Sequence, residues 1–208
     1  MVDWVAVVLA KKEGVYATDA VPTAAANGIL TRNYSSKVLE VDQIDRNLDT
    51  QGYGAQASAP SNARRTISYE VEIAGSGAAG TAPAWMELLE GCGMAAAVIS
   101  AGVDAQQSFA AAGVAATSLT HYDFLSDQRR KALGCVGTFS MDFTSGAYPF
   151  FGFNWTGLVP VATPFDTSAP GAVTLARWKK PAEVNTDNTA FSLDGYSPRL
   201  RSWKAEGG

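Results

Sequence analysis

The feature that most constrains the fold of this chain is a segment whose two-residue period changes to a helical period across a glycine-rich loop. Residues 66–73 alternate between apolar side chains and Thr, Ser or Glu, as in a strand with one buried and one solvated face. Residues 75–80 are glycine, serine and alanine, which favour a loop. The i, i+3, i+4 and i+7 spacing of a short amphipathic helix then follows at Trp85, Leu88, Leu89 and Cys92. The sequence therefore predicts a strand, a loop and one helix.

The glycine loop matches a nucleotide-binding motif, but its surroundings do not fit one. Gly75, Gly77 and Gly80 have the G-x-G-x-x-G spacing, where a dinucleotide-binding fold places its phosphate loop. A central parallel strand is apolar on both faces, whereas the strand before this loop carries Glu70 and Glu72. No second strand–helix–strand unit follows in the sequence. We interpret the loop as a flexible connector and expect no cofactor.

The remainder of the chain is predicted to consist of strands and long irregular segments. Residues 119–125 form a strand, and residues 131–144 and 147–159 form a long hairpin. Its two arms place large apolar side chains on one face each, which we expect to form the core: Phe139, Met141 and Phe143, and Phe151, Phe153 and Trp155. Further strands are predicted at residues 2–10, 29–34, 37–41, 188–196 and 199–203, and irregular segments at residues 11–26, 42–62, 95–118 and 160–189.

Composition narrows the classes of function. Apolar residues make up 47% of the 208 residues and charged residues only 17%, which is low for a solitary soluble domain and indicates that other subunits cover part of the surface. The net charge of −4 argues against a nucleic-acid-binding footprint. No apolar run approaches the roughly 20 residues of a membrane span, and no signal peptide opens the chain, so we expect a cytoplasmic protein.

The residue types that carry catalysis or bind metals are sparse. His121 is the only histidine, and we interpret it as a structural residue of a strand. Cys92 and Cys135 are expected to be buried and reduced. Because no hydrolase, metalloprotease or Walker motif is present, we expect neither catalytic nor metal-binding residues and predict that the chain is not an enzyme.

Charged residues gather in one acidic loop and three basic clusters. Asp42, Asp45 and Asp49 lack the oxygen spacing of a calcium loop, so a solvated loop is expected. The basic clusters are interpreted as soluble corners or intersubunit salt bridges. They are Arg64-Arg65, Arg129-Arg130-Lys131 and Lys179-Lys180.

Several segments together resemble the major tail tube protein of long-tailed, siphovirus-type bacteriophages. The strand–loop–helix segment of residues 69–94 is similar to that family's signature, and the others keep its order and spacing over most of the chain. These others are Glu40–Arg46, Lys131–Ser140, Phe151–Leu158 and Phe191–Tyr196.

The resemblance implies a mainly β fold of the β-sandwich or barrel type, with one helix and long extended loops, that forms rings. Residues 1–188 then form the tail tube domain, with an arm at residues 42–62 and an insertion at residues 95–118. Residues 189–208 form a C-terminal strand pair, which in longer relatives precedes a second, related half. A single-domain chain is expected to form hexameric rings, and a longer protein trimers that mimic them.

The resemblance also implies a structural virion protein. Its rings stack into the hollow tube through which double-stranded DNA passes into the host, without specific binding and without a membrane contact. The implied partners are further copies of the chain, the tape-measure protein in the lumen, and the tail terminator and distal tail proteins. The implied location is the virion tail, assembled in the cytoplasm of the bacterial host.

Two groups of site residues follow. The arm is expected to contact the adjacent ring through Asp42, Asp45, Arg46, Asp49 and Tyr53. An acidic lumen would repel DNA and speed its passage, so the solvated strand faces that carry Glu70, Glu72 and Asp142 are candidates for the lining.

Two alternatives remain open. One is another self-assembling tube protein, from a secretion or injection apparatus. The other is a β-sandwich carbohydrate-binding module, in which Phe151, Phe153 and Trp155 form a platform for a sugar rather than the core.

Overall fold

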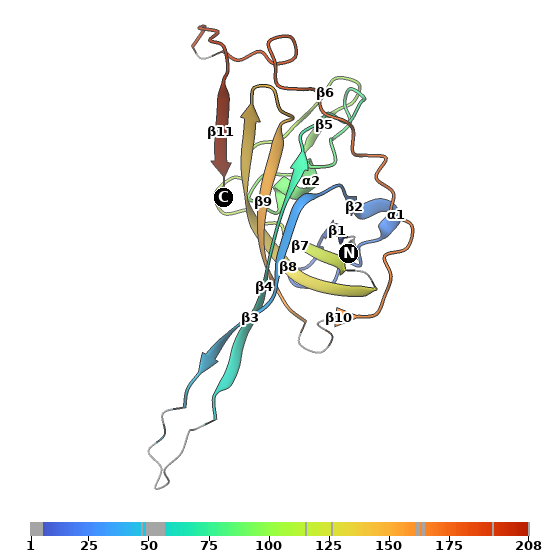
Figure 1. The fold of residues 1–208 in the computed structure, drawn as a ribbon, viewed down its shortest axis with the longest axis vertical. Coiled ribbons are helices and arrows are strands. Elements are labelled where there is room, and N and C mark those ends of the chain that lie inside the picture. The colour runs from blue at the N-terminus through green and yellow to red at the C-terminus, as the bar shows by residue number, and fades with distance from the viewer. Residues whose placement is uncertain are drawn as a thin grey trace.

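The computed structural model describes residues 6–46, 48, 57–114, 116–125, 127–160, 163, 165–192 and 194–207. In these residues the chain is elongated: a broad, β-rich body fills the upper part of Figure 1, and a two-stranded hairpin extends below it. We call the projecting hairpin, residues 37–44 and 59–64, the arm. The same two strands continue from the arm into the body, so the arm is an extension of the main sheet.

Among the described residues, nine strands form one antiparallel sheet. Its order is β2-β1-β7-β8-β9-β4-β3, and β10 and β11 also pair with β8. The strands are β1 (Ala6–Lys12), β2 (Gly28–Ile29), β3 (Arg32–Ile44), β4 (Ala59–Glu72), β7 (Leu119–Leu125), β8 (Gln128–Thr144), β9 (Phe150–Leu158), β10 (Phe165–Asp166) and β11 (Ser202–Gly207). The predicted mainly β fold is confirmed.

Strand β8 joins two parts of this sheet because its two halves pair with different neighbours. The first half pairs with β7, whereas the second lies between β9 and β11. The two parts share one core. The ring of His121 on β7 lies 4.8 Å from the ring of Trp155 on β9, and Val8 of β1 belongs to the same buried cluster as Ile67 of β4.

Aromatic side chains of β4 and β9 form the centre of that core. Phe153 and Trp155 stack with their ring centroids 5.6 Å apart, and Tyr69 lies 5.9 Å from Phe153. These three side chains are at most 2% exposed. Because aromatic side chains bury the largest apolar areas, this stack supplies much of the hydrophobic stabilisation of the body.

Two short helices pack against the sheet. Helix α2 (Met86–Glu90) confirms the predicted helix, and its Leu88 and Leu89 join the core cluster. Trp85, just before it, donates its indole N–H to the carbonyl oxygen of Ala74 at 2.8 Å, which fixes the helix to the preceding loop. Helix α1 (Ala24–Asn27) is a single turn within the segment predicted as irregular.

The glycine loop packs against a small separate hairpin. Strands β5 (Val98–Ser100) and β6 (Asp104–Gln106) pair within the predicted insertion. Gly80 has a φ of +67°, and a Cβ atom there would lie 2.2 Å from the backbone nitrogen of Gly102. Only glycine allows this conformation and this approach, so the last glycine of the motif has a packing role.

The structure corrects two predictions around β3. This strand runs through Ser35 and Ser36, which separate the two strands predicted at residues 29–34 and 37–41, and it continues to Ile44, which pairs with Ala59 of β4. Part of the expected loop at residues 42–62 is therefore paired strand. The pattern fails here because both faces of the arm are exposed, which removes the alternation that marks a half-buried strand.

The C-terminal prediction is also corrected. The described residues between 189 and 201 form no strand, and β11 pairs with residues 139–144 of β8 instead of with a local partner. The free edge of β8 provides backbone groups for β11, a pairing between distant segments that local periodicity does not reveal.

Candidate assembly surfaces

The three acids predicted to line a lumen lie on one face of the sheet. Glu70 pairs with Gly152 of β9, which pairs with Ser140 of β8, and one register step away Glu72 and Asp142 both pair with Phe150. Directly opposed residues of antiparallel strands point to the same side. The face that carries these acids is opposite to the one that carries the aromatic core, and we call it the polar face.

The polar face carries both signs of charge. Arg32 Nε lies 2.6 Å from Glu70 Oε2, and Lys204 Nζ of β11 lies 2.8 Å from Asp142 Oδ2. The hydrogen bond from Lys204 holds the pKa of Asp142 below its usual value. Two of the three acids are thus matched by a nearby cation, and the face is mixed rather than acidic.

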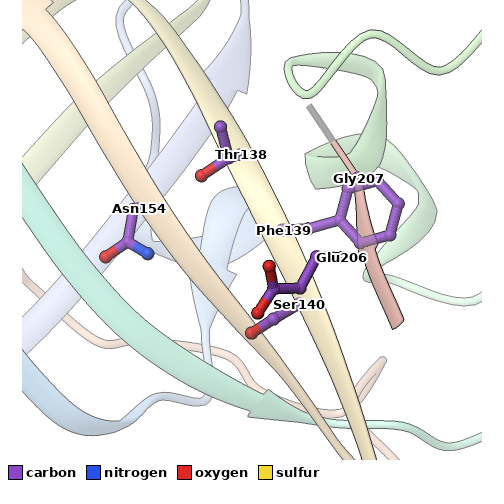
Figure 2. A pocket seen from close by; sticks show the side chains of 6 residues that line it. All are labelled: Thr138, Phe139, Ser140, Asn154, Glu206 and Gly207. Carbon is purple, nitrogen blue, oxygen red and sulfur yellow. The ribbon is translucent and has the colours of Figure 1, made fainter. Parts of the chain in front are cut away.

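The polar face is hollowed beside β11. One hollow of about 450 Å³ is lined by residues of β8, β9 and β11, which are Thr138, Phe139, Ser140, Asn154, Glu206 and Gly207. Figure 2 shows Thr138 and Ser140 on one side of β8 and the ring of Phe139 on the other. The hollow therefore presents hydroxyl, amide and carboxylate groups to solvent, while the aromatic ring stays with the core.

The arm is held together by polar contacts between its two strands. Asp42 of β3 accepts hydrogen bonds from Asn62 Nδ2 at 3.1 Å and from Arg64 at 3.0 Å. These bonds, with Asn62 the larger cause, lower the pKa of the Asp42 carboxyl. Among the predicted arm residues, Asp42 therefore stabilises the arm itself.

Two of the other predicted arm residues follow directly after β3. Asp45 and Arg46 are exposed beyond the end of β3, where they are available to a partner. Asp49 and Tyr53 lie outside the described residues. The structure thus separates Asp42, which has partners in the arm, from two exposed charged residues that follow it.

The arm also exposes apolar side chains, which the sequence analysis did not single out. Val38, Leu39, Val41 and Ile44 of β3 are 40–56% exposed. An isolated two-stranded hairpin is marginally stable in water, and exposed apolar side chains make it less favourable still. The sequence has five apolar residues between positions 38 and 48. Because they do not alternate regularly with polar residues, the sequence did not predict a strand with exposed apolar side chains here.

An apolar hollow lies where the arm meets the body. It has a volume of about 330 Å³ and an almost entirely apolar lining, formed by Leu39, Val41, Pro60, Ser61, Asn62, Ala63 and Val159. We call it the arm-base hollow. Arg65, two residues after Ala63, belongs to the buried side of β4. The arm-base hollow therefore lies on the same side of the sheet as the core. The opposite part of the body does not cover the sheet at this place.

A buried ionic cluster was missed by the sequence analysis. Arg65 and Asp123 are 1% and 0% exposed, with guanidinium and carboxylate 2.5 Å apart. Arg130 Nε lies 3.3 Å from the same carboxylate, and Tyr34 donates its hydroxyl to it at 2.7 Å. The prediction that the basic clusters are soluble corners or intersubunit salt bridges is therefore wrong for Arg65 and Arg130, which are buried against Asp123 of the same chain. A buried charge needs a partner, and Asp123 provides one for both.

His121 lies in the core next to this cluster. Its Nε2 atom is 3.0 Å from the Tyr69 hydroxyl, and the side chain is fully buried. Burial, with the nearby Arg65 guanidinium as a smaller cause, lowers the pKa of His121 to about 3. The neutral imidazole at physiological pH packs on Trp155 as part of the core, as the structural interpretation predicts.

The structure also bears on the remaining site predictions. Cys92 and Cys135 are buried and unbridged. Within the described ranges, no group of three or more His, Cys, Asp and Glu side chains is arranged to hold a metal ion. The helices of the same ranges are too short to cross a membrane.

The sugar platform considered from the sequence is ruled out at the residues that suggested it. Phe151, Phe153 and Trp155 are 2%, 1% and 0% exposed and face the interior. A stacking platform for a sugar ring needs an accessible aromatic face, and none of these three rings offers one. They are core residues.

Comparison with known proteins adds no family assignment. The sequence matches no protein-family model. A search of curated proteins also finds no match.

Proposed function

We propose that this chain is the structural subunit of a self-assembling hollow tube, and that this tube is a bacteriophage tail tube of the kind its sequence resembles. Copies join into rings, and rings stack into a conduit for DNA and a tape-measure protein. The observation that carries the proposal is the arm. It extends beyond the body and exposes apolar side chains that only another chain can cover.

Ring formation is supported by the edges of the sheet. In the part made of β11, β8, β9, β4 and β3, the outer strands β11 and β3 each pair on one side only among the described residues. A free strand edge is a template for another strand. Contact between β11 of one copy and β3 of the next removes both edges when the ring closes, and we propose six copies per ring.

The polar face is the proposed lining of the tube. It carries solvated side chains of both signs, including the Arg32–Glu70 and Lys204–Asp142 pairs. DNA binds tightly to surfaces where cations gather without matching acids. A mixed face lets DNA pass without being held, so passage does not depend on a strongly acidic lumen.

Stacking of rings is the proposed role of the arm. The arm can be shortened cleanly because Ile44 and Ala59 are paired across it. Replacing residues 45–58 by Asn-Gly joins these residues through a two-residue hairpin turn. We expect a folded subunit with the circular dichroism of the parent chain but without long tubes. Tubes of normal length from this variant would show that residues 45–58 are not needed for stacking.

Electron microscopy of the purified chain at rising concentration tests the proposal as a whole. Hollow rings or tubes are the expected result, and their rotational symmetry separates six copies from three. Dispersed monomers over the whole concentration range, from a protein shown to be folded, would overturn the proposal.

A further inference from the structure

The β5–β6 hairpin is a second place where apolar side chains lie exposed together. Val98, Ile99 and Val103 are 67%, 47% and 72% exposed. Asp104 is the one charged residue between 98 and 106, and its carboxylate accepts a hydrogen bond from Gln106 Nε2 at 2.6 Å. The hairpin therefore presents an exposed, mainly apolar tip that carries a single acid.

This tip is held in place by the body. The close approach of Gly80 to the turn of the hairpin fixes it on one side. On the other side, Gln107 donates its amide to the carbonyl oxygens of Met86 and Ala95 at 3.0 and 2.9 Å. An apolar surface that is held rigid binds a partner without first being ordered, which lowers the entropic cost of binding.

The tip and the arm-base hollow are both mainly apolar. The hollow is concave, and Leu39, Val41, Pro60 and Ala63 contribute to its apolar lining. Its volume of about 330 Å³ accommodates more than one aliphatic side chain. The lining of the hollow includes no charged side chain, and Asp104 is the one acid of the hairpin, so the apolar side chains of the hairpin suit the apolar lining of the hollow.

The two surfaces lie far apart on one molecule. Figure 1 shows β5 and β6 near the upper end of the long axis and the arm at the lower end. A copy therefore cannot fill its own hollow with its own hairpin. A contact between unlike surfaces at opposite ends of the body repeats from copy to copy and produces an open-ended stack.

We propose that the occupant of the arm-base hollow is the β5–β6 hairpin of a second copy of this chain. The proposal rests on the proposed tube and deepens it, because it identifies the surface that receives the arm of the adjacent ring. Val103, the most exposed of the three apolar side chains, enters the hollow beside Leu39.

Disulfide cross-linking tests this contact with the full chain. The double variant Leu39→Cys with Val103→Cys carries one thiol on each surface, whereas the natural Cys92 and Cys135 are buried. Under mild oxidation, the assembled double variant is expected to give a ladder of covalent dimers, trimers and longer species. Each single variant gives no species beyond a dimer. The matched control combines Leu39→Cys with Val15→Cys. Val15 is 68% exposed and Val103 is 72% exposed, but Val15 lies in the loop after β1 and not on the hairpin.

The outcomes separate this inference from the proposed function. The hairpin contact and the proposed tube are both supported if the Leu39–Val103 variant gives the ladder and the Leu39–Val15 control does not. If the variant pellets as polymer but gives no ladder, or no more than the control, the hairpin contact is overturned and the tube remains. If neither the variant nor the parent chain forms polymer, the proposed function itself is overturned.

Discussion

Strands β3 and β4 are neighbours in one sheet, yet their apolar side chains lie in opposite environments. Ile67, Tyr69 and Val71 of β4 are 1–2% exposed, because β9 and the opposite part of the body cover them. Leu39 and Val41 of β3 are 56% and 40% exposed. The chain covers the first group itself and leaves the second group uncovered. The difference locates the surface that needs another copy.

Removing the central ring of the covered region is expected to have the largest effect. Trp155→Ala leaves a cavity in the aromatic stack and lowers the free energy of unfolding by about 3–5 kcal/mol, as measured by urea denaturation. Retained stability would mean that the aromatic cluster is not the core. It would also remove the contrast with the arm.

Breaking the buried ion pair is the next largest expected effect. Arg65→Met leaves the Asp123 carboxylate buried with less compensation, which costs about 3 kcal/mol in the free energy of unfolding. The loss is at the lower end for a buried pair because Arg130 and Tyr34 still contact that carboxylate. The double variant Arg65→Met with Asp123→Leu is expected to recover part of the loss, whereas an equal or larger loss would contradict this account of the cluster.

The buried histidine predicts a pH dependence of the body. The pKa of His121 is about 3 in the folded chain, and the ordinary value of 6.5 applies when it is unfolded. The unfolded chain therefore takes up a proton below pH 6.5 that the folded chain refuses. The stability contribution of His121 is complete above pH 6.5 and is lost as pH falls toward 3, by up to about 1.4 kcal/mol per pH unit.

Urea denaturation between pH 7.5 and pH 5 measures this slope. The variant His121→Gln is expected to show a shallower slope than the parent chain over that range. An unchanged slope would mean that His121 is protonated in the folded chain.

The smallest effect on stability is expected in the arm. Leu39→Ala changes the free energy of unfolding of the dispersed chain by no more than about 0.5 kcal/mol, because the side chain is already solvated. Leu119→Ala is the matched control, since Leu119 is 0% exposed and the same substitution there costs about 2–5 kcal/mol. We expect sedimentation to show that Leu39→Ala raises the concentration needed for assembly. Equal losses of stability in the two variants would contradict the comparison.

The predictions from sequence succeeded where structure is local. Strand β7 has the predicted bounds of Leu119–Leu125, and the β8–β9 hairpin and helix α2 lie where periodicity placed them. Strand β9 has one buried and one more exposed face, so its side-chain pattern reports its environment directly, whereas β7 is buried on both faces. The polar face with Glu70, Glu72 and Asp142 follows from the same alternation.

The features that the sequence did not predict depend on distant partners. Arg65 belongs to a pair of adjacent arginines that resembles a soluble corner, and its burial depends on Asp123, 58 residues away. The pairing of β11 with β8 and the length of the arm depend on register between separate segments. The cation that matches Asp142 comes from β11, so the mixed charge of the polar face was not readable either.

Hydrogen exchange measured on the dispersed and the assembled chain tests the central claim most directly, because it compares both regions in one experiment. If another copy covers the arm, amides of residues 38–44 and 59–64 exchange rapidly in the dispersed chain and become strongly protected in the assembled fraction. Peptides covering residues 151–155 are expected to be protected in both states. Arm amides that exchange at the same rate in the two states would contradict the claim that another copy covers the arm.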